Sequence, residues 1–144
     1  MTGAIIVVAF SFYILEFIIG WGLQQAGISA PWASMIIPPL LGGLCGGMQF
    51  ARTERRGMRI PRRLSCAFSS CLAIVFAPLL FAFAVLLIHA IAGGLSFLPL
   101  VPNIASFLTL AGLIQMAVFT LYGLPAIFIG LTAGQWLQYK RMIQ

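Results

Sequence analysis

Hydrophobic residues fall into four long runs along the chain, which short polar or basic segments separate. A bilayer core of about 30 Å needs roughly 20 apolar residues in helical conformation, and each run approaches or exceeds that length. The predicted spans cover approximately residues 4–23, 31–50, 64–92 and 105–137. The pattern therefore predicts an all-α membrane protein, in which four transmembrane helices form a single domain over residues 1–144.

Proline residues fall inside two of these runs. Pro38 and Pro39 remove two adjacent backbone donors from the second run, so we expect this helix either to kink there or to start effectively at Pro39. In the last run Pro125 is the expected bend, because a proline removes one donor and crowds the preceding turn. A break of residues 105–137 into two half-segments is the alternative.

The composition narrows the class of protein. The chain has 144 residues, of which 62% are hydrophobic and only 7% are charged, and its mean hydropathy is +1.09. A soluble domain usually carries about 25% charged residues, which excludes a water-soluble globular fold. A disordered chain is excluded as well, because such chains are poor in apolar residues and rich in charge.

The basic residues are concentrated at two places, the loop 51–63 and the C-terminal end. The loop carries six arginines, which are Arg52, Arg55, Arg56, Arg59, Arg62 and Arg63. With Lys140 and Arg141, all eight basic residues fall on one side of a four-span chain. By the positive-inside rule, both termini and this loop are expected in the cytoplasm, which argues against a nucleic-acid groove. The first span is expected to be retained, because Met-Thr-Gly lacks the basic segment of a cleavable signal peptide.

Small residues recur at four-residue spacing in the second and third runs, where they permit close helix contact. In the second run they form two overlapping GxxxG patterns, and the third run offers a strip of Ser and Ala. The residues concerned are Gly42, Gly43, Gly46, Gly47, Ser65, Ser69, Ala73 and Ala77. We expect the second span to pack on the third along these strips. The alternative is that the glycine face docks a partner subunit, and Gly130 with Gly134 could serve either purpose.

Three polar side chains are predicted to lie within the spans: Glu16, Gln115 and His89. An ionised carboxylate is costly in the membrane, so Glu16 is expected to be protonated, hydrogen-bonded or facing a wet cavity. Gln115 falls within roughly one helical turn of the same depth. Other candidate partners of Glu16 are Tyr13, Thr109 and Thr120. Glu16 is interpreted either as structural or as ionisable in function, and His89 as an interfacial or hydrogen-bonded side chain.

The chain offers little material for catalysis. It has two carboxylates, one His and three cysteines without a Cys-x-x-Cys pair. It also lacks a glycine-rich phosphate loop and a set of residues for a Ser-His-Asp triad. We therefore expect no enzymatic activity, no metal and no cofactor, and we expect Cys45, Cys66 and Cys71 to act as small apolar packing residues.

The segment 46–63 resembles a group of small, uncharacterised four-span proteins of the bacterial inner membrane. It contains GGMQFAR at residues 46–52 and GMRIP at residues 57–61. In that group a glycine-rich second span ends in a Phe and a basic residue, before a Gly-Arg-x-Pro-like loop. Here Met58 separates the Gly from the Arg, and Arg62-Arg63 replace the acid that usually follows the proline. The resemblance implies a multi-pass protein of the bacterial inner (cytoplasmic) membrane and brings no known activity.

A fainter resemblance is to the small multidrug resistance transporters, which are four-helix proteins with an acid in the first span. In that family the carboxylate binds protons and cations, and Glu16 is its match here. The segment 13–20 shares only the acid and a following glycine with that family. The chain is also longer, with a stronger basic loop.

Taken together, these patterns favour a protein that acts through interaction. The expected role is an accessory, assembly or lipid-organising subunit of a larger membrane complex. Its expected partners are membrane lipids, especially anionic lipids at the arginine loop, and other membrane-protein subunits. The alternative is a proton-coupled small-solute transporter or channel that uses Glu16.

Overall fold

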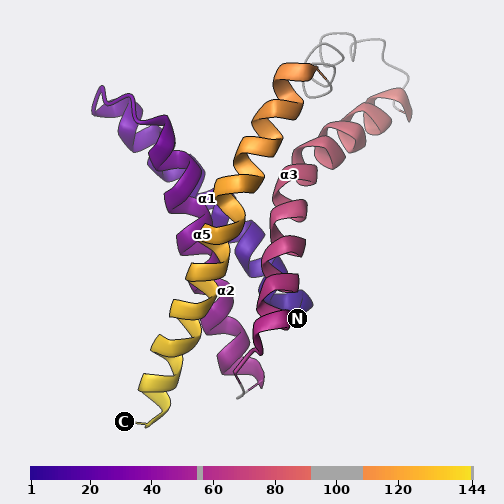
Figure 1. Ribbon diagram of the computed structural model, residues 1–144. Helices are drawn as coiled ribbons and strands as arrows, with labels where there is room; N and C mark the ends of the chain where they lie inside the picture. The colour runs from indigo at the N-terminus through magenta and orange to yellow at the C-terminus, as the bar shows by residue number, and fades with distance from the viewer. Residues whose placement is uncertain (55–56, 92–108, 144) are drawn as a thin grey trace.

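The computed structural model describes residues 1–54, 57–91 and 109–143, and this part of the chain contains four α-helices and no strand. The helices are α1 (Thr2–Gln25), α2 (Pro31–Glu54), α3 (Ile60–Ile91) and α5 (Leu110–Ile143). They run in alternating directions, so the start of α1, the end of α2, the start of α3 and the end of α5 share one end (Figure 1). The prediction of an all-helical chain is confirmed for these residues.

Three of the described helical segments are long and apolar enough to cross a membrane. They are Thr2–Gln25 of α1, Ile60–Val85 of α3 and Ala111–Arg141 of α5. Helix α2 has 24 residues, as does α1, but it is not among the three. Glycine, proline and polar residues take many of its positions in place of large apolar ones.

Helix α2 lies between α1 and α5, and its glycines allow this close arrangement. A β carbon added at Gly42 would lie 2.9 Å from the carbonyl oxygen of Val8 in α1. One added at Gly43 would collide with the carbonyl oxygen of Ile127 in α5, and one at Gly47 with that of Leu131. The two overlapping glycine patterns therefore give α2 two separate contact faces, one for each neighbour.

The contact between α2 and α5 is reciprocal. Gly130 and Gly134 of α5 lie against the backbone of α2, where a β carbon would collide with the carbonyl oxygens of Leu40 and Leu44. Because both helices contribute glycines, their backbones approach more closely than Ser or Ala would allow.

The predicted packing of the second span on the third is wrong. Helix α3 makes its main contacts with α5 and α1 rather than with α2. Ser65 is exposed at the start of α3, while Ser69, Ala73 and Ala77 are half-buried. Although α2 and α3 are consecutive in the sequence, the glycines of α5 fit the second face of α2 better than a Ser and Ala strip does.

Prolines are accommodated inside three of the helices. Helix α2 begins at Pro31 and continues through the fully buried Pro38 and Pro39, so the alternative that it starts at Pro39 is wrong.

Helix α5 is one helix that includes Pro125, so the proposed break into two half-segments is wrong as well. The expected start of this helix at residues 105–108 lies outside the described residues. Helix α3 contains Pro78.

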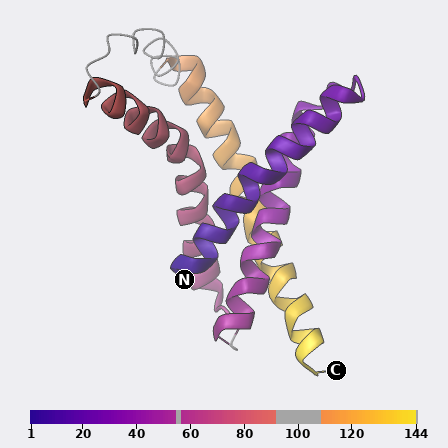
Figure 2. The same cartoon turned by 180° about the vertical axis from the view of Figure 1, so that it is seen from behind.

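The buried core lies in the half of the molecule that contains the termini. The buried residues of α1 are Ala4, Val8 and Phe12, and those of α5 include Ile127 and Leu131. At the other end, α3 and the first half of α5 lean away from the α1 and α2 pair, as both views show (Figures 1 and 2).

Candidate functional site

A cavity of about 370 Å³ lies between α1, α3 and α5, where these helices diverge. Tyr13, Glu16 and Gln115 supply its polar lining. The remaining lining residues are apolar or lack a side chain: Phe12, Ile74, Val75, Pro78, Gly112, Met116 and Phe119. The cavity thus combines a largely apolar wall with a carboxyl group and an amide.

One wall of the cavity is fixed by a hydrogen bond between helices. In a helix the carbonyl of Ile74 normally accepts from the residue four positions later, which here is Pro78 and has no N–H. The hydroxyl of Tyr13 in α1 donates to this carbonyl oxygen at 2.6 Å. The proline therefore creates an acceptor in α3, and Tyr13 satisfies it from the neighbouring helix.

Aromatic rings close the cavity toward the core. Phe12 is only 4% exposed. Its ring meets that of Tyr13 edge-on at 5.2 Å between centroids, and that of Phe119 at 5.5 Å. Such edge-to-face pairs add to the stabilisation from burial. The three rings form one packed, largely apolar part of the cavity lining.

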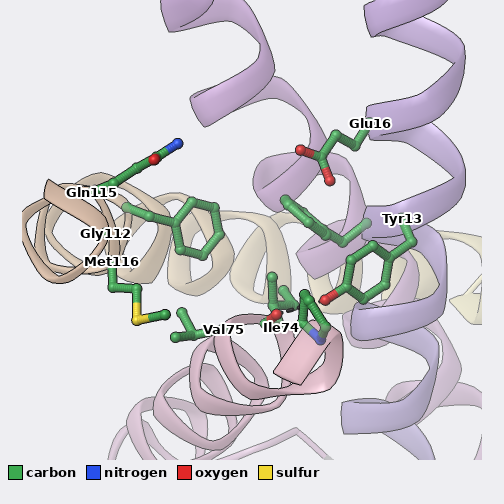
Figure 3. Close-up of a pocket in the computed structure, with 10 residues that line it drawn as sticks. Tyr13, Glu16, Ile74, Val75, Gly112, Gln115 and Met116 are labelled. Atoms are coloured by element: carbon green, nitrogen blue, oxygen red, sulfur yellow. Dashed lines mark hydrogen bonds between the residues drawn. The ribbon is translucent and has the colours of Figure 1, made fainter. Parts of the chain in front are cut away.

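Glu16 and Gln115 project toward the same cavity from opposite helices (Figure 3). Both side chains are exposed. Within the described part of the chain, neither makes a hydrogen bond or an ion pair, with the other or with a third residue. The sequence predicts a similar depth for these two residues, and the structure places them on one cavity without direct pairing.

The other candidate partners of Glu16 have different roles. The hydroxyl of Tyr13 is bonded to Ile74. That of Thr120 donates to the carbonyl oxygen of Met116 at 2.8 Å, and that of Thr109 accepts from the N–H of Gly112 at 3.2 Å.

Metal-ligating side chains are not clustered in the described residues, among which no group of three His, Cys, Asp or Glu could hold a metal ion. His89 lies in the last turn of α3, and its side chain is outside the described part. Cys66 and Cys71 are buried, Cys45 is half-buried, and all three are free thiols.

A second polar cluster lies at the opposite end of the molecule, where the segment before α3 docks on α5. Met58 is 1% exposed, and its N–H donates to Oε1 of the buried Gln135 at 3.1 Å. The guanidinium of Arg63 donates to the carbonyl oxygen of Met58 at 2.7 Å and to Thr132 Oγ1 at 3.4 Å. Nothing in the local sequence pattern marks Met58, Thr132 and Gln135 as contacts, so they are not among the predicted site residues.

The arginines of the loop 51–63 therefore do not act as one set. Arg63 is half-buried and bonded within the chain, which makes it an internal contact rather than the docking residue we expected. Arg59 and Arg62 are exposed and line a cavity of about 320 Å³ together with Phe50, Glu54 and Gly57. Arg52 is exposed and does not line it, and Arg55 and Arg56 lie outside the described residues.

Comparison with protein-family models, with curated proteins and with solved structures finds no match to this chain.

Proposed function

We propose that this chain is a four-span protein of the bacterial inner membrane with both termini in the cytoplasm. Its role is that of an accessory or assembly subunit, without enzymatic activity. The side of the membrane is inferred from the eight basic residues, all of which fall at the ends and in the loop assigned to the cytoplasm.

The place of α2 between α1 and α5 supports its assignment as a membrane span in addition to the three apolar helical segments. A helix that neighbouring helices shield from lipid needs less apolar surface of its own. Its glycines are in contact with the backbones of both neighbours, as small residues are at helix interfaces in membranes.

The main support for the accessory role comes from two polar side chains, Glu16 and Gln115. They line one cavity and have no hydrogen-bond partner among the described residues. A polar group in the membrane is stabilised by a hydrogen-bond partner. The described part of this chain supplies no hydrogen-bond partner for either residue. We therefore assign that partner to a second protein molecule. The glycine faces are occupied inside the chain and are not available for this contact.

Purification in mild detergent with mass analysis of the co-purifying proteins tests the accessory role. The double substitution Glu16→Leu and Gln115→Leu should release a defined partner. The matched control is Phe17→Ala with Leu121→Ala, at side chains that are 75% and 69% exposed and do not line the cavity. Equal retention of the partner by both double variants would contradict the role assigned to Glu16 and Gln115.

The alternative of a proton-coupled small-solute transporter has one observation in its favour. The cavity volume of about 370 Å³ falls in the range of small-molecule sites, roughly 300–1,000 Å³, and Glu16 lies on its lining. Purification as a bare homo-oligomer, with flux that depends on pH, would favour this alternative.

A further inference from the structure

The face of α3 that packs into the core is buried before Pro78 and exposed after it. Ala67, Ile74 and Phe81 follow one another at seven-residue spacing, which is close to two helical turns, so they share this face. Ala67 is 0% exposed and Ile74 is 4% exposed, whereas Phe81 is 72% exposed. The change falls at Pro78, inside the helix. The distal part of α3, residues 79–91, therefore does not continue the packing of the part before it.

The direction in which the distal part of α3 bends follows from the side on which Pro78 lies. The ring of a proline crowds the carbonyl four positions earlier, here that of Ile74, and this opens the helix on the side that both residues share. That side faces α1, because the carbonyl oxygen of Ile74 accepts from the hydroxyl of Tyr13. The distal part should therefore tilt away from α1, as both views show (Figures 1 and 2).

This tilt leaves the cavity of Glu16 and Gln115 open. Helix α3 contributes Ile74, Val75 and Pro78 to the lining, and among the described residues none beyond Pro78 takes part. Both polar side chains are exposed. In a straight α3 the face of Phe81 would continue along α1 and would cover this cavity.

We propose that Pro78 is a positioning residue that holds the cavity open, so that Glu16 and Gln115 are accessible to a partner. It acts through the angle of the distal part of α3. The hydroxyl of Tyr13 satisfies the carbonyl that the bend leaves without a donor, so the open form contains no unpaired acceptor at Ile74. The partner measurement below rests on the proposed accessory role, whereas the distance and stability measurements do not.

Distances between two spin labels on the isolated full chain test the bend. The labels are attached at Leu87 in the distal part of α3 and at Ile18 in α1, which are both more than half exposed, in a variant without the three native cysteines. The rise from Pro78 to Leu87 is roughly 14 Å, so removal of a kink of about 20° moves Leu87 by about 5 Å. Pro78→Ala should shorten the distance between the labels by about this amount. An unchanged distance would overturn the proposal.

Two controls separate the bend from other effects. Pro125→Ala restores a backbone donor in α5, at an exposed proline that does not line the cavity, and it should leave the distance unchanged. A second pair of labels at Ile6 and Phe68 reports on exposed positions before the bend, and its distance should not respond to Pro78→Ala. Equal shortening of both label distances would show a general compaction of the chain and would contradict a hinge at Pro78.

Thermal unfolding in detergent provides an independent measurement. Straightening of α3 should bury Phe81, so Phe81→Ala should lower the unfolding temperature of Pro78→Ala but not that of the unsubstituted chain. Phe83→Ala is the matched control, because Phe83 is 66% exposed and lies two residues further along, on the opposite face of the helix. It should have no effect in either background. Equal effects of the two phenylalanine substitutions in Pro78→Ala would mean that the distal part does not close over the cavity.

Retention of a co-purifying partner links the bend to the accessory role. Pro78→Ala should lose the partner, as the double substitution Glu16→Leu and Gln115→Leu does, while Pro125→Ala should keep it. A partner that Pro78→Ala keeps and the double variant loses would overturn the part of the bend in partner binding. Retention by both would contradict the accessory role instead, and the label distances would still decide whether Pro78 holds the cavity open.

Discussion

The hydroxyl of Tyr13 and the carbonyl oxygen of Ile74 are 2.6 Å apart, and this hydrogen bond joins α1 to α3. It exists because Pro78 cannot donate to that carbonyl. The bond lies beside the cavity that also contains Glu16 and Gln115. One sequence feature, a proline inside a helix, therefore determines both a helix contact and a wall of the candidate site.

Tyr13→Phe should destabilise the protein by about 1–2 kcal/mol, since it leaves the carbonyl of Ile74 without a donor. Thermal unfolding in detergent measures the change. Tyr122→Phe is the matched control, because Tyr122 is 52% exposed and its hydroxyl makes no hydrogen bond within the described part of the chain.

A double-mutant cycle tests the cause of this effect. Pro78→Ala restores a backbone donor four residues after Ile74, so Tyr13→Phe should cost much less in that background. Equal costs of Tyr13→Phe in both backgrounds would show that the proline does not create the acceptor that Tyr13 serves.

Gly47→Ala should destabilise the chain by about 1–3 kcal/mol, because the new methyl group collides with the carbonyl of Leu131 in α5 and separates the helices. Gly22→Ala in α1 is the control. No atom lies within 4 Å of the β carbon that it adds, and alanine favours a helix over glycine by about 1 kcal/mol. Opposite signs for the two substitutions are expected in thermal unfolding of the isolated chain, and equal effects would contradict the glycine seam.

Glu16 distinguishes the two candidate functions. In an accessory subunit Glu16→Gln should keep the partner, because the amide has a similar shape and hydrogen-bonding capacity. Glu16→Leu should weaken the complex by about 1–2 kcal/mol, as expected for a lost hydrogen bond between helices. In a proton-coupled transporter Glu16→Gln should instead abolish flux while the fold remains intact. Partner retention and pH-dependent flux are measured for the unsubstituted chain, Glu16→Gln and Glu16→Leu. Together the two measurements separate the accessory subunit from the transporter.

The proposed topology predicts different access for single cysteines in a variant without Cys45, Cys66 and Cys71. A cysteine at Gln25 should react with an impermeant thiol reagent added to intact cells. One at Gly57 should react only after the membrane is opened. Labelling of the Gly57 position from outside would reverse the proposed orientation.

The positions of the helices could be predicted well from the sequence. The predicted spans 4–23 and 31–50 fall within α1 and α2. Length and hydrophobicity are local properties, so they can be counted along the chain. The shared cavity of Glu16 and Gln115 was partly predictable too, because depth follows from the rise of about 1.5 Å per residue. Their lack of direct pairing was not, since depth does not fix the rotation of a helix.

The amino-acid sequence by itself determined an all-helical chain, its apolar spans and the place of its basic residues. Only the tertiary structure decided that Gly43 and Gly47 meet α5 rather than α3, that Tyr13 serves Ile74, and that Arg63 is an internal contact. The physical reason is that hydrophobicity is a sum over neighbouring residues. A helix contact depends instead on which backbones can approach each other, and residues far apart in the sequence decide that together.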